Sequence, residues 1–323
     1  MRADSLTPIL HIYLQRALPG WADGAPNATR RALPRAPSRA ALERLHPSER
    51  HCNRPLLDSL VSSYALWPRR QRAMALAIGC GDRPRTSEPQ FRKEVLPALR
   101  GALSTGLFRR VFYSMMDERV EGVDTLPQML SWHYIAGREE ALYRAIRGAQ
   151  VSAKPKGVLA AWGARLLRSG RAGPTSDTQD AADLTAWLQG AGAPLVEKQR
   201  MVAFDRYFDE LAQHRFLLAP RGAAVLSPKF AEALLVMTIP ITKRYAAFED
   251  LRDYGFPLVV VDDWTDITQE RLDAWWAELS PQLPAARWVA TAEGLTSLLE
   301  GTCYEAGGEA TNMTPTEAFA GPC

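Results

Sequence analysis

Apolar residues in the second half of the chain alternate between short continuous runs and runs with helical spacing. Phe204, Tyr207, Phe208 and Leu211 lie at i, i+3, i+4 and i+7, which predicts one face of a helix. Leu272, Trp275, Trp276 and Leu279 repeat this spacing after Thr268, a good N-cap residue, and Phe230, Leu234 and Met237 share one side of another helix. Between these helices, continuous apolar runs predict buried strands at 157–163, 215–219, 238–241 and 256–264.

The first half of the chain is less regular. Apolar runs at 74–83 and 107–116 predict strands, and 137–148 predicts a helix with Leu142, Ala145 and Ile146 on one face. Residues 20–55 are rich in Pro, Arg and Ala and are predicted to be irregular. Gly, Pro and Ser at 168–184 predict a polar loop.

This alternation of strands and helices predicts an α/β fold with a mostly parallel sheet covered by helices on both faces. We expect an irregular N-terminal segment at 1–55 and an N-terminal α/β domain at 56–150. A clearer C-terminal α/β domain would follow at 151–300, with a tail at 301–323.

Composition adds few constraints on function. The net charge of +3 over 323 residues does not indicate a nucleic-acid partner. Arginines at 30–50 form a basic stretch that Glu43 and Glu49 interrupt, so it is read as a solvated segment or, alternatively, as a site for a polyanion. The four cysteines form no CxxC pair and match no zinc spacing, and they permit two disulfides without requiring them.

No apolar run in the sequence is long enough to span a membrane. The first twenty residues lack the apolar core of a signal peptide. The expectation from the sequence is therefore a cytoplasmic protein, or a chain that lacks its natural start.

The segment 219–227 is the best candidate for binding chemistry. It follows a predicted strand and precedes a helix that Ser227 and Pro228 would open as N-cap and first residue. The small residues after Gly222 would let a ligand approach the backbone, and the first N–H groups of a helix attract anions. Arg221 and Lys229 flank the turn and can add charge-assisted bonds.

Glu232 lies one turn into that helix, where its carboxylate can accept hydrogen bonds from the two hydroxyls of a ribose. Spacing alone leaves two readings open. One is a phosphate site, and the other is a plain turn followed by a helix on which Glu232 is a solvated residue.

A longer pattern extends over 200–280. Tyr207 is followed by FLLAPRG at 216–222, AEAL at 231–234 and TIPI at 238–241, and a strand then leads into Asp262-Asp263-Trp264. In order and spacing this resembles the C-terminal half of exostosin-like glycosyltransferases, a group that includes the ribitol xylosyltransferase relatives. The resemblance covers about a quarter of the chain.

The resemblance implies two facing Rossmann-like domains of GT-B type, with the C-terminal one binding a nucleotide sugar, usually a UDP-sugar. It implies donor contacts from Arg221, Gly222, Ser227, Lys229 and Glu232, with Glu232 on the ribose. It also implies a glycan or glycoprotein acceptor, no metal or other cofactor, and the Golgi or secretory pathway. Lys229 stands where the family has an arginine, which keeps the charge but loses the bidentate fork.

The donor loop departs from the family pattern. Ala223, Leu226 and Pro228 replace polar residues, Ala231 replaces a tryptophan, and Thr238 replaces a glycine. These departures leave the activity of the loop in question.

No catalytic base is assigned from the sequence. Asp117, Glu118 and His133 are candidates by residue type only. Asp262 and Asp263 are read as the end of a strand, where Asp262 caps a turn, rather than as a metal-binding pair.

Three hypotheses follow. The first is a metal-independent glycosyltransferase, and the second is a degenerate relative that serves as a binding or scaffold protein. The third is an unrelated nucleotide-binding α/β protein. The altered loop favours the second, whereas Arg221, Gly222 and Glu232 favour the first.

Overall fold

A computed structural model describes ten segments of the chain, and the fold and the site below rest on them. They are residues 75–78, 85–104, 110–127, 139–161, 176–198, 202, 206–221, 224–289, 302–304 and 310–312.

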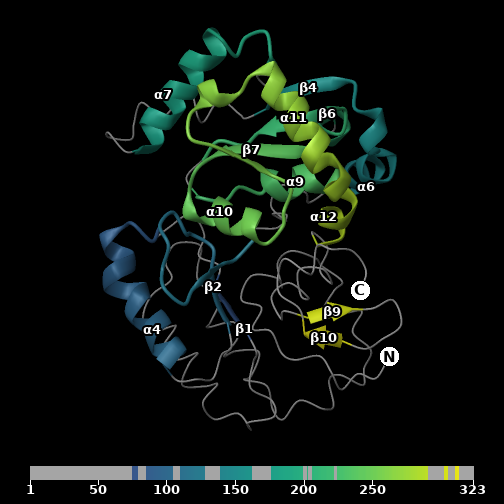
Figure 1. The fold of residues 1–323 in the computed structure, drawn as a ribbon. Coiled ribbons are helices and arrows are strands. Elements are labelled where there is room, and N and C mark those ends of the chain that lie inside the picture. The colour runs from purple at the N-terminus through teal and green to yellow at the C-terminus, as the bar shows by residue number, and fades with distance from the viewer. Residues whose placement is uncertain are drawn as a thin grey trace.

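Within these segments, the larger sheet is parallel and has five strands, and it lies in the upper part of Figure 1. Its strands are β4 (Lys156–Ala160), β5 (Val196–Lys198), β6 (His214–Leu218), β7 (Ile239–Lys243) and β8 (Val259–Val261). Their order across the sheet is β5-β4-β6-β7-β8. This is a doubly wound order, in which the direction of winding reverses between β4 and β6.

The strands are apolar on both faces because helices cover both. Val158 and Ala160 of β4 face the main core, whereas Leu159 faces a second core cluster on the opposite side. The same division separates Phe216 from Leu217 in β6. A sheet buried on both faces needs continuous apolar runs rather than alternation, which explains the run in each strand.

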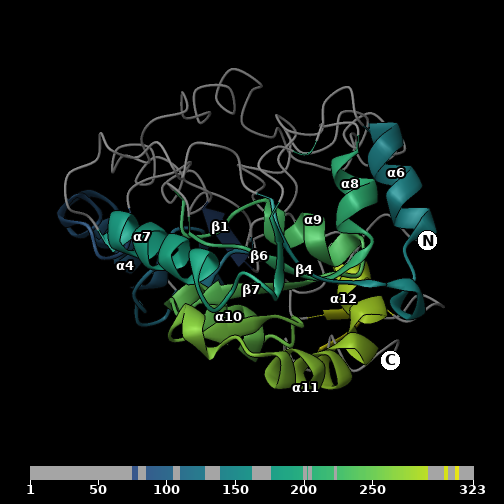
Figure 2. The ribbon, with the colours of Figure 1, turned by 90° about the horizontal axis from the view of Figure 1, so that it is seen from above.

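Three helices contribute to the second core cluster: α6 (Glu139–Gly148), α8 (Tyr207–Leu211) and α9 (Lys229–Leu235). On the main-core side lie α7 (Ser176–Gln189), α10 (Ala246–Asp253) and α11 (Gln269–Leu279). Figure 2 shows α10 and α11 on one side of β6 and β7, with α8 and α9 on the other. The helix α12 (Leu283–Val289) packs against α9.

A smaller parallel sheet contains β1 (Ala75–Ile78), β2 (Arg110–Tyr113) and β3 (Asp124–Thr125). The helical stretch of η4 (Phe91–Val95) and α4 (Leu96–Ser104) lies between β1 and β2 in the chain. Two further strands, β9 (Thr302–Tyr304) and β10 (Ala310–Asn312), pair antiparallel. Short single turns complete the described elements: η5 (Val151–Ala153), η7 (Trp264–Asp266) and η8 (Ser280–Gln282).

The helix α10 joins the two parallel sheets (Figure 1). The N–H of Ala247 donates to the carbonyl of Met116, which follows β2, at 2.9 Å. The hydroxyl of Thr125 donates to Asp250 Oδ2 at 2.6 Å, and the amide of Thr125 donates to the Tyr254 hydroxyl at 3.1 Å. The main hydrophobic core accordingly includes side chains from both sheets.

Most predicted elements are confirmed, including the α/β class and the parallel sheet. Thr268 caps α11, because its side chain accepts a hydrogen bond from the N–H of Arg271. The predicted loop at 168–184 is wrong from Ser176 onward, where α7 begins. Leu184, Trp187 and Leu188 are buried at helical spacing, and this apolar face outweighs the polar residues that precede it.

The expected start of α9 is also corrected. The helix begins at Lys229, and Pro228 occupies the N-cap position without a side-chain cap. Ser227 Oγ accepts a hydrogen bond from the Lys229 amide at 3.4 Å, but Ser227 is not the N-cap residue. In the part of the chain that the structure describes, no helix combines the length and apolar character needed to cross a bilayer.

Candidate functional site

The carboxyl ends of strands from both parallel sheets meet in one cluster of charged side chains. Arg221 follows β6, Tyr245 follows β7 and Asp117 follows β2, while the turn from Arg85 to Glu88 comes after β1. Ligands of open parallel sheets bind beyond the carboxyl ends of the strands, close to the point where winding reverses. The cluster thus lies on the side of both sheets where such a ligand is expected.

Arg221 is the central cation of this cluster. Its side chain is 3% exposed, and Nη1 lies 3.9 Å from Asp117 Oδ2. The guanidinium carbon lies 4.7 Å from the centre of the Tyr245 ring, a cation–π contact. Burial lowers the pKa of Arg221, and the positive charge of Arg85 acts in the same direction. Arg221 still stays charged, because an arginine pKa starts far above neutral pH.

Asp117 is held by the turn after β1. One carboxylate oxygen accepts from the amide of Ser87 at 2.9 Å and from Thr86 Oγ1 at 2.8 Å, and the other accepts from Ser87 Oγ at 2.5 Å. Burial would raise the pKa of Asp117, but the hydrogen bonds from Ser87 and Thr86 outweigh it and hold the pKa below its usual value. An ionised carboxylate with these partners is a weak proton acceptor.

Tyr245 connects Arg221 to α7. Its hydroxyl donates to Asp180 Oδ2 at 2.8 Å, and Lys243 Nζ lies 3.1 Å from Asp180 Oδ1. Burial raises the pKa of Tyr245 well above its usual range, so the hydroxyl stays protonated and acts as the donor.

Lys229 and Glu232 lie together beside Tyr207. Lys229 Nζ donates to the Tyr207 hydroxyl at 3.1 Å, and that hydroxyl also hydrogen-bonds the carboxylate of Glu232. Glu232 is 5% exposed, and its burial raises the pKa of the carboxyl against the opposing effect of Lys229. Burial likewise lowers the pKa of Lys229. The ribose-binding role of Glu232 stays a prediction.

The predicted donor residues therefore divide into two sets. Lys229 and Glu232 contact Tyr207, and Ser227 touches the amide of Lys229, whereas Arg221 contacts Asp117 and Tyr245. Gly222 and Ala223 lie outside the described residues. Leu226 is fully buried in the main core, so its apolar side chain has a packing role.

The other sequence candidates lie in different settings. Glu118 is exposed and pairs with Arg92 at 3.4 Å, and His133 lies outside the described residues. Asp262 binds Arg244 through its exposed carboxylate. The cap is Asp263 rather than Asp262, because Asp263 accepts from the Thr265 amide at 2.9 Å to begin η7.

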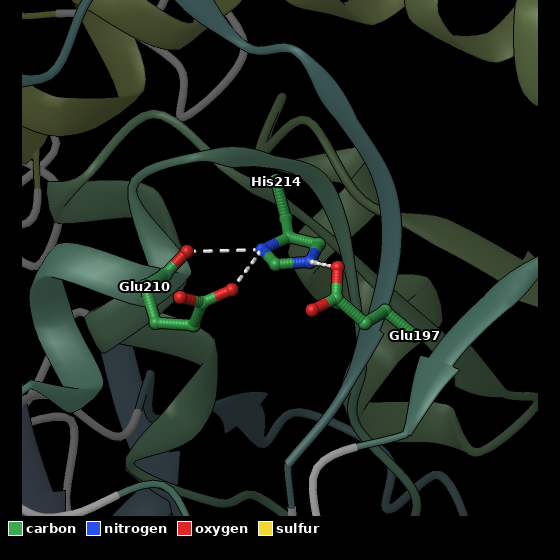
Figure 3. Close-up of side chains that lie close together, drawn as sticks. All are labelled: Glu197, Glu210 and His214. Atoms are coloured by element: carbon green, nitrogen blue, oxygen red, sulfur yellow. Dashed lines mark hydrogen bonds and ion pairs between the residues drawn. The ribbon is translucent and has the colours of Figure 1, made fainter.

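A different group of side chains has the residue types of a metal site. Glu197, Glu210 and His214 bring ligand atoms within 4.8 Å of one another (Figure 3). However, the ammonium of Lys156 contacts the carboxylates of both Glu197 and Glu210. His214 is fully buried, with Nδ1 2.9 Å from the Glu210 carbonyl and Nε2 3.2 Å from Glu197 Oε2. The lysine supplies the positive charge that these carboxylates require.

Sequence reasoning missed Tyr245, Asp180, Ser87 and Arg85. Tyr245 had a usable signal, because it follows a predicted strand at the edge where ligands bind. Asp180 lay in a segment predicted as a loop, and Ser87 in one without a prediction. The contacts of Ser87 with Asp117 and of Tyr245 with Asp180 join residues 30 or more positions apart, which no local pattern reveals.

Strand order and strand-end chemistry define a doubly wound α/β protein with a buried arginine beyond the carboxyl ends of its strands. No family model and no curated protein matches the sequence. Among solved structures, an α1,3-fucosyltransferase matches with 11% identity over 78% of each chain and a TM-score of 0.27.

Proposed function

We propose that this chain is a glycosyltransferase that uses a nucleoside diphosphate sugar, with Arg221 binding the diphosphate. The main support for the proposal is that the carboxyl ends of strands from both sheets meet at Arg221. The sequence resemblance to exostosin-like glycosyltransferases supports the choice of a UDP-sugar as donor and a glycan or other hydroxyl compound as acceptor.

The chemistry of sugar transfer suits a fixed cation at this edge. As the bond from sugar to diphosphate breaks, negative charge grows on the leaving phosphate. A preorganised cation in a site shielded from water stabilises that charge strongly. Arg221 would supply this stabilisation without a metal, and Lys229 would add a second positive charge near the same loop.

The first experiment is a calorimetric titration with uridine diphosphate of the wild type, Arg221→Gln and Arg215→Gln. Arg215 is the matched control, because it lies on β6, the strand that precedes Arg221, but is 40% exposed and contacts Trp276 instead. We expect Arg221→Gln to weaken binding by about tenfold or more, as loss of a charge-assisted contact does. Arg215→Gln should bind as the wild type does. Equal binding by all three proteins would refute the role of Arg221.

The role of Glu232 is tested by comparing two ligands. If Glu232 holds the ribose, Glu232→Gln weakens binding of uridine diphosphate and leaves binding of pyrophosphate unchanged. Equal loss for both ligands would instead indicate that the contacts of Glu232 with Tyr207 and Lys229 shape the whole loop. Metal independence predicts that a chelator changes neither binding constant.

A catalytically degenerate binding protein is the second candidate. The burial of Arg221 and Glu232 favours it, since both side chains are covered and in contact with protein groups. On this hypothesis the wild type binds neither uridine nor guanosine diphosphate.

A further inference from the structure

The contact between Arg221 and Asp117 is an ion pair without a close hydrogen bond. Its separation of 3.9 Å exceeds hydrogen-bond distance. Both side chains are buried, at 3% and 7% exposure, so water screens their attraction only weakly. Asp117 thus balances the charge of Arg221 chiefly through electrostatics.

The hydrogen bonds of Asp117 go to the smaller sheet instead. Ser87 and Thr86 donate three hydrogen bonds to the carboxylate, and Oδ2, the oxygen nearest Arg221, receives the one from Ser87 Oγ at 2.5 Å. An anion can therefore take over the guanidinium while Asp117 keeps all of these bonds.

We propose that Asp117 competes with the donor diphosphate for Arg221 and so limits how tightly the leaving nucleoside diphosphate is held. This inference rests on the proposed function. The negative charge of Asp117 attracts Arg221 when the ligand is absent and repels the phosphates when the ligand is present. Both effects weaken binding, and they favour release of the product after sugar transfer.

Ser87 sets the strength of this competition. Its hydroxyl holds Oδ2 toward the smaller sheet. Without that hydroxyl, Oδ2 can turn toward Arg221 and form a closer ion pair. Removal of the charge on Asp117 and removal of the Ser87 hydroxyl should therefore change diphosphate affinity in opposite directions.

The experiment titrates wild type, Asp117→Asn, Ser87→Ala and Asp273→Asn with uridine diphosphate and with pyrophosphate. The asparagine removes the negative charge and keeps one oxygen, which can accept from the Ser87 amide and from Thr86. Its NH2 group takes the place of Oδ2, and the Ser87 hydroxyl can turn to accept from it. Asp273→Asn makes the same charge change on the exposed face of α11 and controls for net charge. Thermal unfolding of each variant reports whether the fold is kept.

We expect Asp117→Asn to bind both ligands about three- to tenfold more tightly, as removal of one nearby like charge does. Ser87→Ala should bind them about two- to threefold more weakly, and Asp273→Asn should match the wild type. General damage to the site would weaken both test variants, so opposite signs identify competition.

Two results would overturn the inference. Unchanged or weaker binding by Asp117→Asn, with binding by the wild type intact, refutes the competition and leaves the proposed function in place. Absence of binding by both the wild type and Asp117→Asn refutes the proposed function as well.

Discussion

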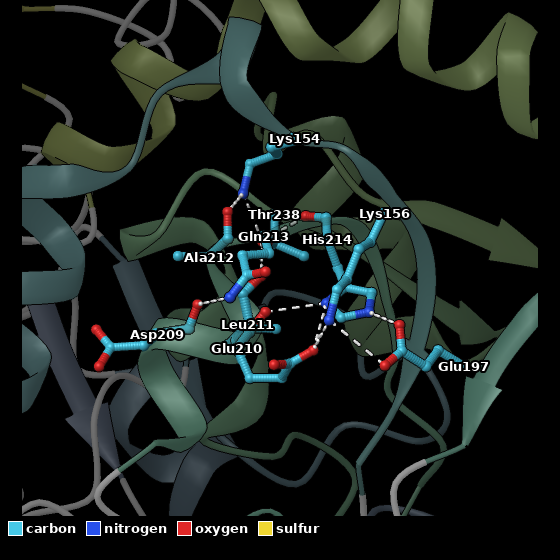
Figure 4. A network of polar contacts seen from close by, with 10 residues as sticks. All are labelled: Lys154, Lys156, Glu197, Asp209, Glu210, Leu211, Ala212, Gln213, His214 and Thr238. Carbon is cyan, nitrogen blue, oxygen red and sulfur yellow. Dashed lines mark hydrogen bonds and ion pairs between the residues drawn. The ribbon is translucent and has the colours of Figure 1, made fainter.

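Lys154 is a buried ammonium group with three acceptors around it, of which Figure 4 shows those on Ala212 and Thr238. Its Nζ donates to the carbonyls of Ala212 and Val236 at 2.7 and 2.9 Å, and to Thr238 Oγ1 at 3.0 Å. Ala212 and Val236 are the C-cap residues of α8 and α9. One side chain thus satisfies the ends of two helices, where carbonyls lack partners and a positive charge is favoured.

Burial lowers the pKa of Lys154 to about 7, whereas an unfolded lysine titrates at about 10.4. Between these values the unfolded chain binds more protons, so stability should rise with pH. We expect the unfolding free energy of the wild type to rise relative to that of Lys154→Met between pH 7 and 9, by about 1 kcal/mol per pH unit. Urea unfolding at each pH measures it. A constant difference would mean that the three acceptors keep the ammonium charged.

Met237 follows the C-cap of α9 with a positive φ of 58°, in the left-handed region, and so lies beyond the helix that was predicted to include it. The amides of Met237 and Thr238 donate back to Leu234 and Ala233, the bonding pattern of a Schellman motif. A side chain in this conformation costs roughly 1–2 kcal/mol, which glycine avoids.

We therefore expect Met237→Gly to be more stable than Met237→Ala by about 1 kcal/mol in urea unfolding. Both variants lose the packing of the methionine side chain, so their difference isolates the backbone effect. An alanine variant at least as stable as the glycine variant would contradict the left-handed conformation.

At the scale of elements, the sequence predicted those whose apolar pattern is local. The strand β6 and the helix α11 were visible, because one contiguous run carries each pattern. The helix α7 was missed, because polar residues fill its first turns and its buried residues come late. The position of Arg221 after a predicted strand identified it as a candidate. Its contact with Asp117 depends on how the two sheets meet, which periodicity does not encode.

The turn after α7 depends on a glycine for space. A Cβ built on Gly192 would lie 2.6 Å from the Trp187 ring, which is buried in the core and cannot move aside. We expect Gly192→Ala to lower the unfolding free energy by about 1–3 kcal/mol, as overpacking does. Gly190→Ala is the matched control, since its Cβ would meet only ordinary contacts at 3.5 Å or more. Equal stability of the two variants would show that the turn can shift to make room for the added methyl group at position 192.

At the scale of the molecule, α10 couples the two parallel sheets through Thr125, Asp250 and Tyr254. Burial raises the pKa of Asp250 despite the hydrogen bond from Thr125 and the charge of Arg119. Loss of the Thr125 hydroxyl would leave this carboxyl without its shortest partner, and such a loss costs about 1–3 kcal/mol. A shared core implies that this cost reaches both sheets.

We therefore predict that Thr125→Val, a substitution in the smaller sheet, destabilises the larger sheet as well. Hydrogen exchange in moderate urea, read peptide by peptide, should show the amides of β6 and β7 exchanging faster by the same factor as those of β2, because one global opening exposes all of them. Thr125→Ser keeps the hydroxyl and should exchange as the wild type does. Faster exchange confined to β2 would mean that the sheets unfold separately, and α10 would then be a contact between independent units.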